Sequence, residues 1–119
     1  MNSSELMAEL SNHYGTEGYQ FNPLYSWLKY TDGVHAFINN AGGGAYWFLD
    51  IIGTELKTLS AIEGFLAIDL VSTGNKAAIK VTDGNDRIVY RKDILYTDCP
   101  AGCWSFFLTD NVMMLSREY

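Results

Sequence analysis

The spacing of the apolar residues changes at Gly64, and this change constrains the fold more than any other feature of the sequence. Before Gly64 apolar residues recur at the three- and four-residue spacing of amphipathic helices, and after it they alternate as in half-buried strands. We therefore predict an α+β fold in which about three N-terminal helices pack on a C-terminal four- or five-stranded antiparallel sheet. The length of 119 residues predicts a single domain over residues 1–119.

Three helices are expected in the N-terminal half. Ser3 or Ser4 can cap a first helix that ends near Asn12, because a side-chain oxygen satisfies a free amide there. The segment 31–33 caps a second helix, and the short aromatic segment 25–30 before it is interpreted as a helical turn packed on the core. The third helix, residues 45–52, is apolar almost all round, which predicts a buried central helix.

Alternation predicts the strands. Leu66, Ile68 and Leu70 share one face of a first strand, and Ala67 and Asp69 point the other way. Further strands are expected over residues 76–82, from 88 to 94, and over residues 104–108 and 112–115, with hairpin loops at 83–86 and 109–111.

Charge and composition exclude several classes of function. The net charge of -6, from 14 acidic and 8 basic residues, opposes binding to nucleic-acid backbones or anionic membranes. It is compatible with a simple solvated surface or with a basic protein partner. The spacing of Cys99 and Cys103 fits neither a zinc hook nor a redox pair. Because the sequence shows neither a signal peptide nor a long apolar run, we expect a cytoplasmic protein. We also expect that it uses no cofactor and no metal.

Two groups of residues are candidates for chemistry. The run Gly42, Gly43 and Gly44 precedes a helix and could present amides to a phosphate, although a tight interhelical turn is the favoured explanation. The carboxylates Asp32, Asp50 and Asp98 could hold a metal ion if the fold brings them together. Asp50 interrupts an apolar helix, so it needs a solvent-facing position or a partner.

Aromatic residues concentrate between positions 14 and 30. Tyrosine and tryptophan are enriched in contact surfaces, so this segment is the first choice for a partner surface. The aromatic members of the predicted binding set are Tyr14, Tyr19, Tyr25 and Trp27.

Four stretches together resemble a known family. They are residues 30–34, 44–50, 96–100 and 115–119, which read YTDGV, GAYWFLD, YTDCP and LSREY. The chain resembles, from about Leu10 to Tyr119, small uncharacterised proteins with a domain of unknown function that occur in bacterial phages, prophages and other mobile elements. The resemblance implies a context but brings no catalytic residues with it.

These observations lead to a functional hypothesis. We expect a non-enzymatic accessory protein that binds a host macromolecule, including a basic nucleic-acid-binding effector, as anti-CRISPR and anti-restriction inhibitors do. Two alternatives remain open. One is a small-molecule or nucleotide-binding module that uses the Gly42–Gly44 turn, and the other is a metal-dependent enzyme that uses Asp32, Asp50 and Asp98.

Overall fold

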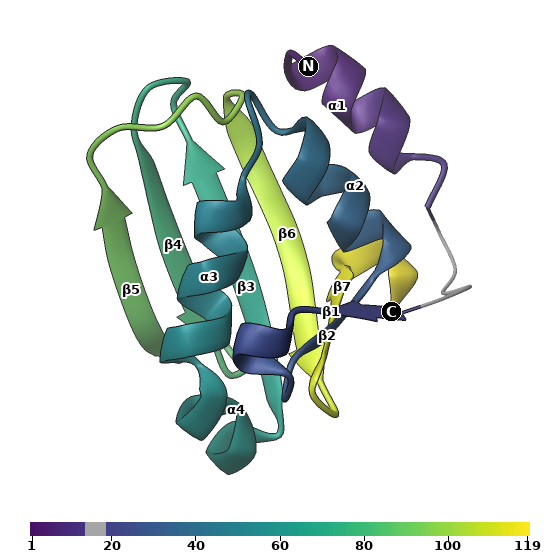
Figure 1. Ribbon diagram of the computed structural model, residues 1–119. Helices are drawn as coiled ribbons and strands as arrows, with labels where there is room; N and C mark the ends of the chain where they lie inside the picture. Colours follow the sequence, from purple (N-terminus) through teal and green to yellow (C-terminus); the bar gives the residue numbers. More distant parts are fainter. Residues whose placement is uncertain (14–18) are drawn as a thin grey trace.

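The computed structural model describes residues 1–13 and 19–119, which form helices packed on one sheet (Figure 1). The α-helices found in these residues are α1 (Ser3–Leu10), α2 (Asp32–Asn40), α3 (Tyr46–Glu55) and α4 (Lys57–Glu63). Two short 3₁₀ helices are η1 (Pro23–Tyr25) and η2 (Ser116–Glu118).

The described residues contribute seven strands to the sheet. They are β1 (Tyr19–Phe21), β2 (Lys29–Thr31), β3 (Phe65–Ser72), β4 (Ala77–Thr82), β5 (Ile88–Ile94), β6 (Gly102–Thr109) and β7 (Val112–Leu115). Their order across the sheet is β1-β2-β7-β6-β3-β4-β5. Neighbouring strands are antiparallel except β2 and β7, which pair in parallel.

The prediction of an α+β fold is confirmed, but the predicted element order and strand number are wrong. Helices and strands are interleaved, because β1 and β2 precede α2. Each of these two strands has three residues, too few to show alternation in the sequence. The segment 25–30, predicted as a helical turn, contains the end of η1 and most of β2. The third predicted helix continues to Glu55, and α4 follows it after Leu56.

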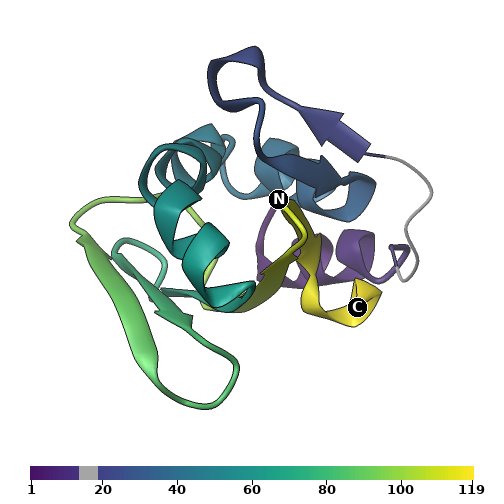
Figure 2. The ribbon, with the colours of Figure 1, turned by 90° about the horizontal axis from the view of Figure 1, so that it is seen from below.

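The hydrophobic core lies between the sheet and the helices α2 and α3, which cover one of its faces (Figures 1 and 2). Leu66, Ile68 and Leu70 point into this core, as their alternation predicts. At its centre Phe37 of α2 and Phe48 of α3 meet Phe106 of β6, with ring centroids 5.0 and 5.2 Å away. Each such buried side chain contributes roughly 1.5–3 kcal/mol to folding.

Helix caps agree only partly with the sequence analysis. The cap of α1 is Asn2 instead of Ser3 or Ser4, because the Asn2 side chain accepts the Glu5 amide at 2.8 Å. At α2 the cap is Thr31, whose hydroxyl accepts the Val34 amide at 3.3 Å. Among the helices of the described residues, none is long and apolar enough to cross a membrane.

Candidate functional site

Asp50, the polar residue in an apolar helix, has a tyrosine as its partner. It lies on the exposed side of α3, and the Tyr25 hydroxyl donates a hydrogen bond to its Oδ1 at 2.7 Å. Tyr25 is buried, and burial followed by this hydrogen bond raises its pKa well above 10.0. The pair therefore holds a protonated phenol against a carboxylate, and this arrangement fixes η1 on α3.

Trp27 belongs to the same contact between η1 and α3. Its indole Nε1 donates to the Gly53 carbonyl at 2.8 Å, and the Tyr25 ring lies against the same glycine. A shallow, open depression of about 500 Å³ adjoins these residues, with Leu24 and Lys57 on its rim. The structure thus brings together three members of the predicted binding set, Tyr25, Trp27 and Asp50, in a contact that is mainly structural.

The Gly42–Gly44 turn faces a second predicted residue, Asp98. The Gly43 amide donates to Asp98 Oδ2 at 2.6 Å, and a Cβ at position 42 would lie 2.6 Å from Asp98 Oδ1. Gly42 has a φ of 60°, which suits glycine at the end of a helix. An internal carboxylate therefore occupies the amide that a phosphate would need, and phosphate binding at this turn stays a prediction.

Asp32 lies apart from the other two carboxylates. Its Oδ1 accepts the Gln20 side-chain amide at 3.3 Å beside β1. Asp50 and Asp98 have the separate partners described above, so the fold does not assemble these three into one site. Within residues 1–13 and 19–119 no group of three or more histidine, cysteine, aspartate or glutamate side chains could hold a metal ion.

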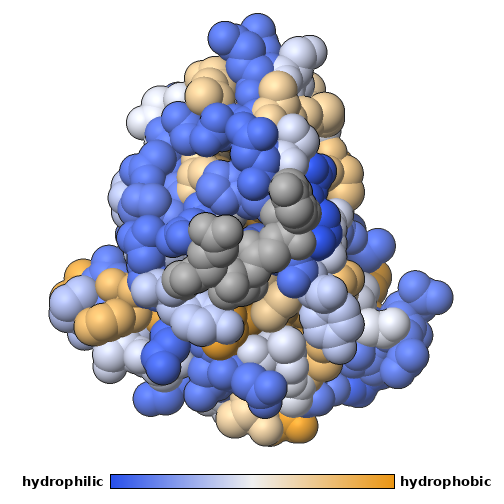
Figure 3. Space-filling view, turned by 90° about the vertical axis from the view of Figure 1, so that its right-hand side faces the viewer, coloured by the Kyte–Doolittle hydropathy of each residue, from blue (hydrophilic) through white to orange (hydrophobic). Residues whose placement is uncertain are grey.

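Two predicted aromatics, Tyr14 and Tyr19, remain. Tyr19 is 58% exposed on the edge strand β1, whereas Tyr14 lies outside the described residues. Figure 3 views the molecule from the right-hand side of Figure 1, and there small apolar patches alternate with larger hydrophilic areas. A partner surface over residues 14–30 stays a prediction.

The two cysteines differ sharply in environment. Cys99 is buried, and burial, aided by the Asp98 charge, raises the pKa of its thiol to about 11. Cys103 is exposed on β6, with its sulfur 3.8 Å from the Ser105 hydroxyl. Cys99 is thus a protonated, packed thiol under neutral conditions, and only Cys103 is accessible.

The face of the sheet opposite α2 and α3 carries a regular grid of side chains, which we name the open face. No helix of the described residues covers it except η2, beyond which Tyr119 makes edge-to-face contacts with Phe65 and Phe107. Strand register places two rows across β6, β3, β4 and β5. The rows are Cys103, Val71, Ala78 and Asp93, and then Ser105, Asp69, Lys80 and Arg91.

The first row continues into a groove, which we name the apolar groove. Its volume is about 370 Å³. Its lining consists of Val71, Thr73, Lys76, Ala77, Ala78, Asp93, Ile94 and Leu95. Leu95 is 71% exposed at the rim, and Tyr96 next to it is 89% exposed. The groove is therefore a largely apolar surface that stays in contact with water.

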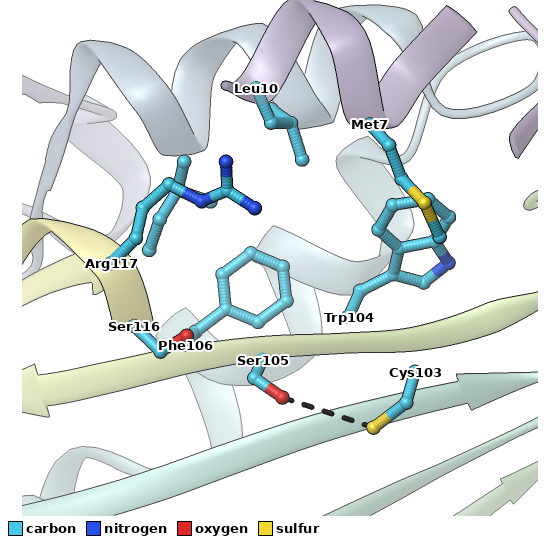
Figure 4. A pocket seen from close by; sticks show the side chains of 9 residues that line it. Met7, Leu10, Cys103, Trp104, Ser105, Phe106, Ser116 and Arg117 are labelled. Carbon is cyan, nitrogen blue, oxygen red and sulfur yellow. Dashed lines mark hydrogen bonds between the residues drawn. The ribbon is translucent and has the colours of Figure 1, made fainter. Parts of the chain in front are cut away.

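A smaller cavity lies between α1, β6 and η2, and we name it the α1 cleft (Figure 4). Its volume is about 200 Å³. Its lining consists of Met7, Leu10, Cys103, Trp104, Ser105, Phe106, Leu115, Ser116 and Arg117. The Arg117 side chain extends from η2 between Leu10 and Phe106 (Figure 4).

None of the residues in the apolar groove or the α1 cleft belongs to the predicted binding set. Leu95 and Tyr96 are two large side chains directly after a predicted strand, and their position in the sequence was the signal for the groove. No local signal marks Arg117, because the cleft joins residues from both ends of the chain.

Comparison with known proteins identifies a family for the chain. Residues 4–119 match the model described as "Family of unknown function (DUF6876)". The chain belongs to this family. Neither a curated protein nor a solved structure matches the chain, so DUF6876 membership carries no activity with it.

Proposed function

We propose that this DUF6876 member is a non-enzymatic accessory protein of a phage, prophage or other mobile element, and that it binds a host protein through the open face. The observation that carries the proposal is the apolar groove with its exposed rim. Leu95 and Tyr96 expose large apolar surface beside a concave floor, and such patches mark interaction sites.

The second row of the open face supports a specific contact. Asp69 presents a negative charge next to the apolar row, and Lys80 and Arg91 present two positive ones. Charges at the rim of an apolar patch contribute mostly to orientation and to rejection of wrong partners. A host protein with a matching apolar protrusion and charged border fits this surface best.

The partners of the carboxylates support binding over catalysis. Asp50, Asp98 and Asp69 each accept a hydrogen bond from Tyr25, the Gly43 amide and the Ser105 hydroxyl, respectively. These carboxylates stabilise contacts between elements, and they lie at separate places in the fold.

The charge of the chain favours a basic target within this proposal. The 14 acidic residues outnumber the 8 basic ones, so long-range attraction favours a nucleic-acid-binding host effector, such as one of a CRISPR or restriction system. Binding to such a target should weaken as salt screens the charges.

A capture experiment with two matched variants tests the proposal. Leu95→Asp places a charge at the groove rim, while Ile62→Asp places one on α4 at a residue of nearly equal exposure, 71% against 72%. The tagged wild type and Ile62→Asp should retain the same host protein from bacterial lysate, and Leu95→Asp should lose it. Equal retention by both variants, or no specific protein, would contradict the proposal.

A cellular assay tests the anti-defence part separately. The chain is expressed in bacteria that carry a CRISPR or restriction system, and the plating efficiency of a targeted phage is measured. Wild type and Ile62→Asp should raise the plating efficiency, whereas Leu95→Asp should not. A retained host protein without any effect on plating would limit the function to binding.

A further inference from the structure

The α1 cleft exists because β7 is shorter than β6. Their pairing ends at Phe106 and Leu115, after which the chain turns into η2. In the described part of the chain, residues 102–105 therefore have no strand partner on this side of β6. Helix α1 lies beside this free edge instead of an eighth strand (Figures 1 and 2).

The free edge leaves backbone groups available at Cys103. The β6–β7 hairpin turns at Asp110 and Asn111, both with positive φ, and such two-residue turns are closed by a hydrogen-bonded pair, here Thr109 and Val112. Hydrogen-bonding direction alternates along an antiparallel strand, so every second residue from Thr109 back to Cys103 directs its N–H and C=O to the β7 side. Because β7 ends before it reaches Cys103, these groups have no strand partner there.

The walls of the cleft are apolar and rigid. Leu10, Trp104 and Phe106 are all at least 95% buried, and the Trp104 indole is fixed by its hydrogen bond to the Pro100 carbonyl at 3.0 Å. The volume of about 200 Å³ is below the roughly 300–1,000 Å³ that is usual for drug-sized ligands. The cleft therefore suits one apolar side chain or a molecule of that size.

Arg117 gives the cleft a preference for ligands of one chemical class. Its guanidinium extends across the mouth of the cleft above Phe106 (Figure 4), and it forms no ion pair with any acid of the described residues. The adjacent Glu118 is engaged elsewhere, since its Oε1 accepts the Thr31 hydroxyl and the Leu115 amide. A guanidinium beside an apolar cavity is suited to a carboxylate, which it binds through two parallel hydrogen bonds.

We propose that the α1 cleft binds an apolar group that carries a carboxylate, with Arg117 pairing the carboxylate and Leu10, Trp104 and Phe106 enclosing the apolar group. The carboxylate can come from the C-terminus of a polypeptide or from a free small acid. A polypeptide gains an additional contact, because its backbone can bond the free edge at Cys103 as an added strand. This site shares Cys103 and Ser105 with the open face, but none of its lining residues belongs to the apolar groove, on which it does not depend.

No residue that lines the cleft is acidic, so no carboxylate of the lining opposes this assignment. Asp69, which accepts the Ser105 hydroxyl at 2.8 Å, lies opposite Lys80 on the neighbouring strand. Arg117 is thus the charged group that the cleft itself presents to a ligand.

Amide chemical shifts measured by NMR during titration test the proposal on the full chain. The probes are N-acetyl-leucine, its uncharged amide, and a tetrapeptide of three alanines and a C-terminal leucine. N-acetyl-leucine should shift the signals of Cys103, Trp104 and Arg117, and the amide should bind about tenfold more weakly, because it cannot form the charge-assisted pair. A tetrapeptide that binds more tightly than N-acetyl-leucine identifies a polypeptide as the source, and equal affinity identifies a free acid.

Two arginine variants complete the test. Arg117→Gln should weaken the binding of N-acetyl-leucine about tenfold and abolish its preference over the amide. Arg87→Gln, between β4 and β5 at an exposed side chain, should leave both affinities unchanged. The proposal is overturned if N-acetyl-leucine shifts no cleft signal, if acid and amide bind equally, or if Arg117→Gln binds like wild type while its spectrum shows a folded chain.

Discussion

The ring of Tyr25 packs on the Cα of Gly53, so closely that a methyl group at position 53 would lie 2.5 Å from Cγ of the ring. Glycine inside a helix is destabilising by roughly 0.5–1 kcal/mol relative to alanine. Here its small size lets η1 approach α3, which in turn places the Tyr25 hydroxyl 2.7 Å from Asp50. The glycine is thus required by the contact.

Gly53→Ala tests this relationship. The gain in helix propensity should be outweighed by the displacement of Tyr25, and overpacking of this kind costs about 1–3 kcal/mol. We expect a lower free energy of unfolding in urea. The control is Thr54→Ala at the next, exposed position, which should change stability by less than about 0.5 kcal/mol. A Gly53→Ala protein as stable as wild type would show that the close packing is absent in solution.

Stability should fall in alkaline solution because of Tyr90 and Tyr25. Burial is the main cause that raises the pKa of Tyr90 to about 12, and the hydrogen bond to Glu55 is the second. Burial and, secondly, the Asp50 carboxylate raise the pKa of Tyr25 further. In the unfolded chain both titrate near 10.0. Above that pH the unfolded state releases protons that the folded state keeps, so the free energy of unfolding decreases as pH rises.

Urea unfolding at a series of alkaline pH values measures this effect. The slope of stability against pH should be negative from about 10 upward and shallower in the double variant Tyr25→Phe/Tyr90→Phe, which removes both phenols. A wild-type slope equal to that of the double variant would contradict the prediction.

Asp98→Ala should loosen the Gly42–Gly44 turn. The variant removes the acceptor of the Gly43 amide, and the loss of this exposed bond should lower stability by about 1 kcal/mol. Asp93→Ala, which removes a carboxylate that is 71% exposed, is the matched control and should have little effect. A stable Asp98→Ala protein would mean that the two loops are held together by other contacts.

The same variant tests phosphate binding at the turn. With Asp98 in place, inorganic phosphate or a nucleotide must displace a carboxylate, so we expect no rise in melting temperature for wild type. If the turn can bind phosphate, Asp98→Ala should reveal it, because the Gly43 amide is free and one negative charge is gone. A rise for wild type would instead favour the nucleotide-binding alternative.

The sequence predicted the parts of the fold that repeat over many residues. Alternation located β3 through β7, because each has at least four residues and most bury one face. It did not locate β1 and β2, which pair with each other, and β2 also pairs with β7 far along the chain.

The candidate sites were less predictable for a related reason. Asp50 was correctly recognised as needing either a solvent-facing position or a partner, and it has both, but nothing local identifies Tyr25 as that partner. The α1 cleft joins Leu10 and Arg117, which are distant in the sequence, through the early end of β7. Contacts of this kind follow from topology, which periodicity does not reveal.

The two cysteines should react at very different rates with a thiol reagent. Cys103 is exposed on β6, whereas Cys99 is 1% exposed and its pKa is raised to about 11 by burial, so it remains a protonated thiol at neutral and mildly alkaline pH. Mass spectrometry of the native protein should show one label, located at Cys103. Cys103→Ser should show none until denaturant is added, when Cys99 becomes labelled. Rapid labelling of Cys99 in the native variant would indicate that the loop 96–100 opens readily, in conflict with its hydrogen bonds to Ser72 and Gly43.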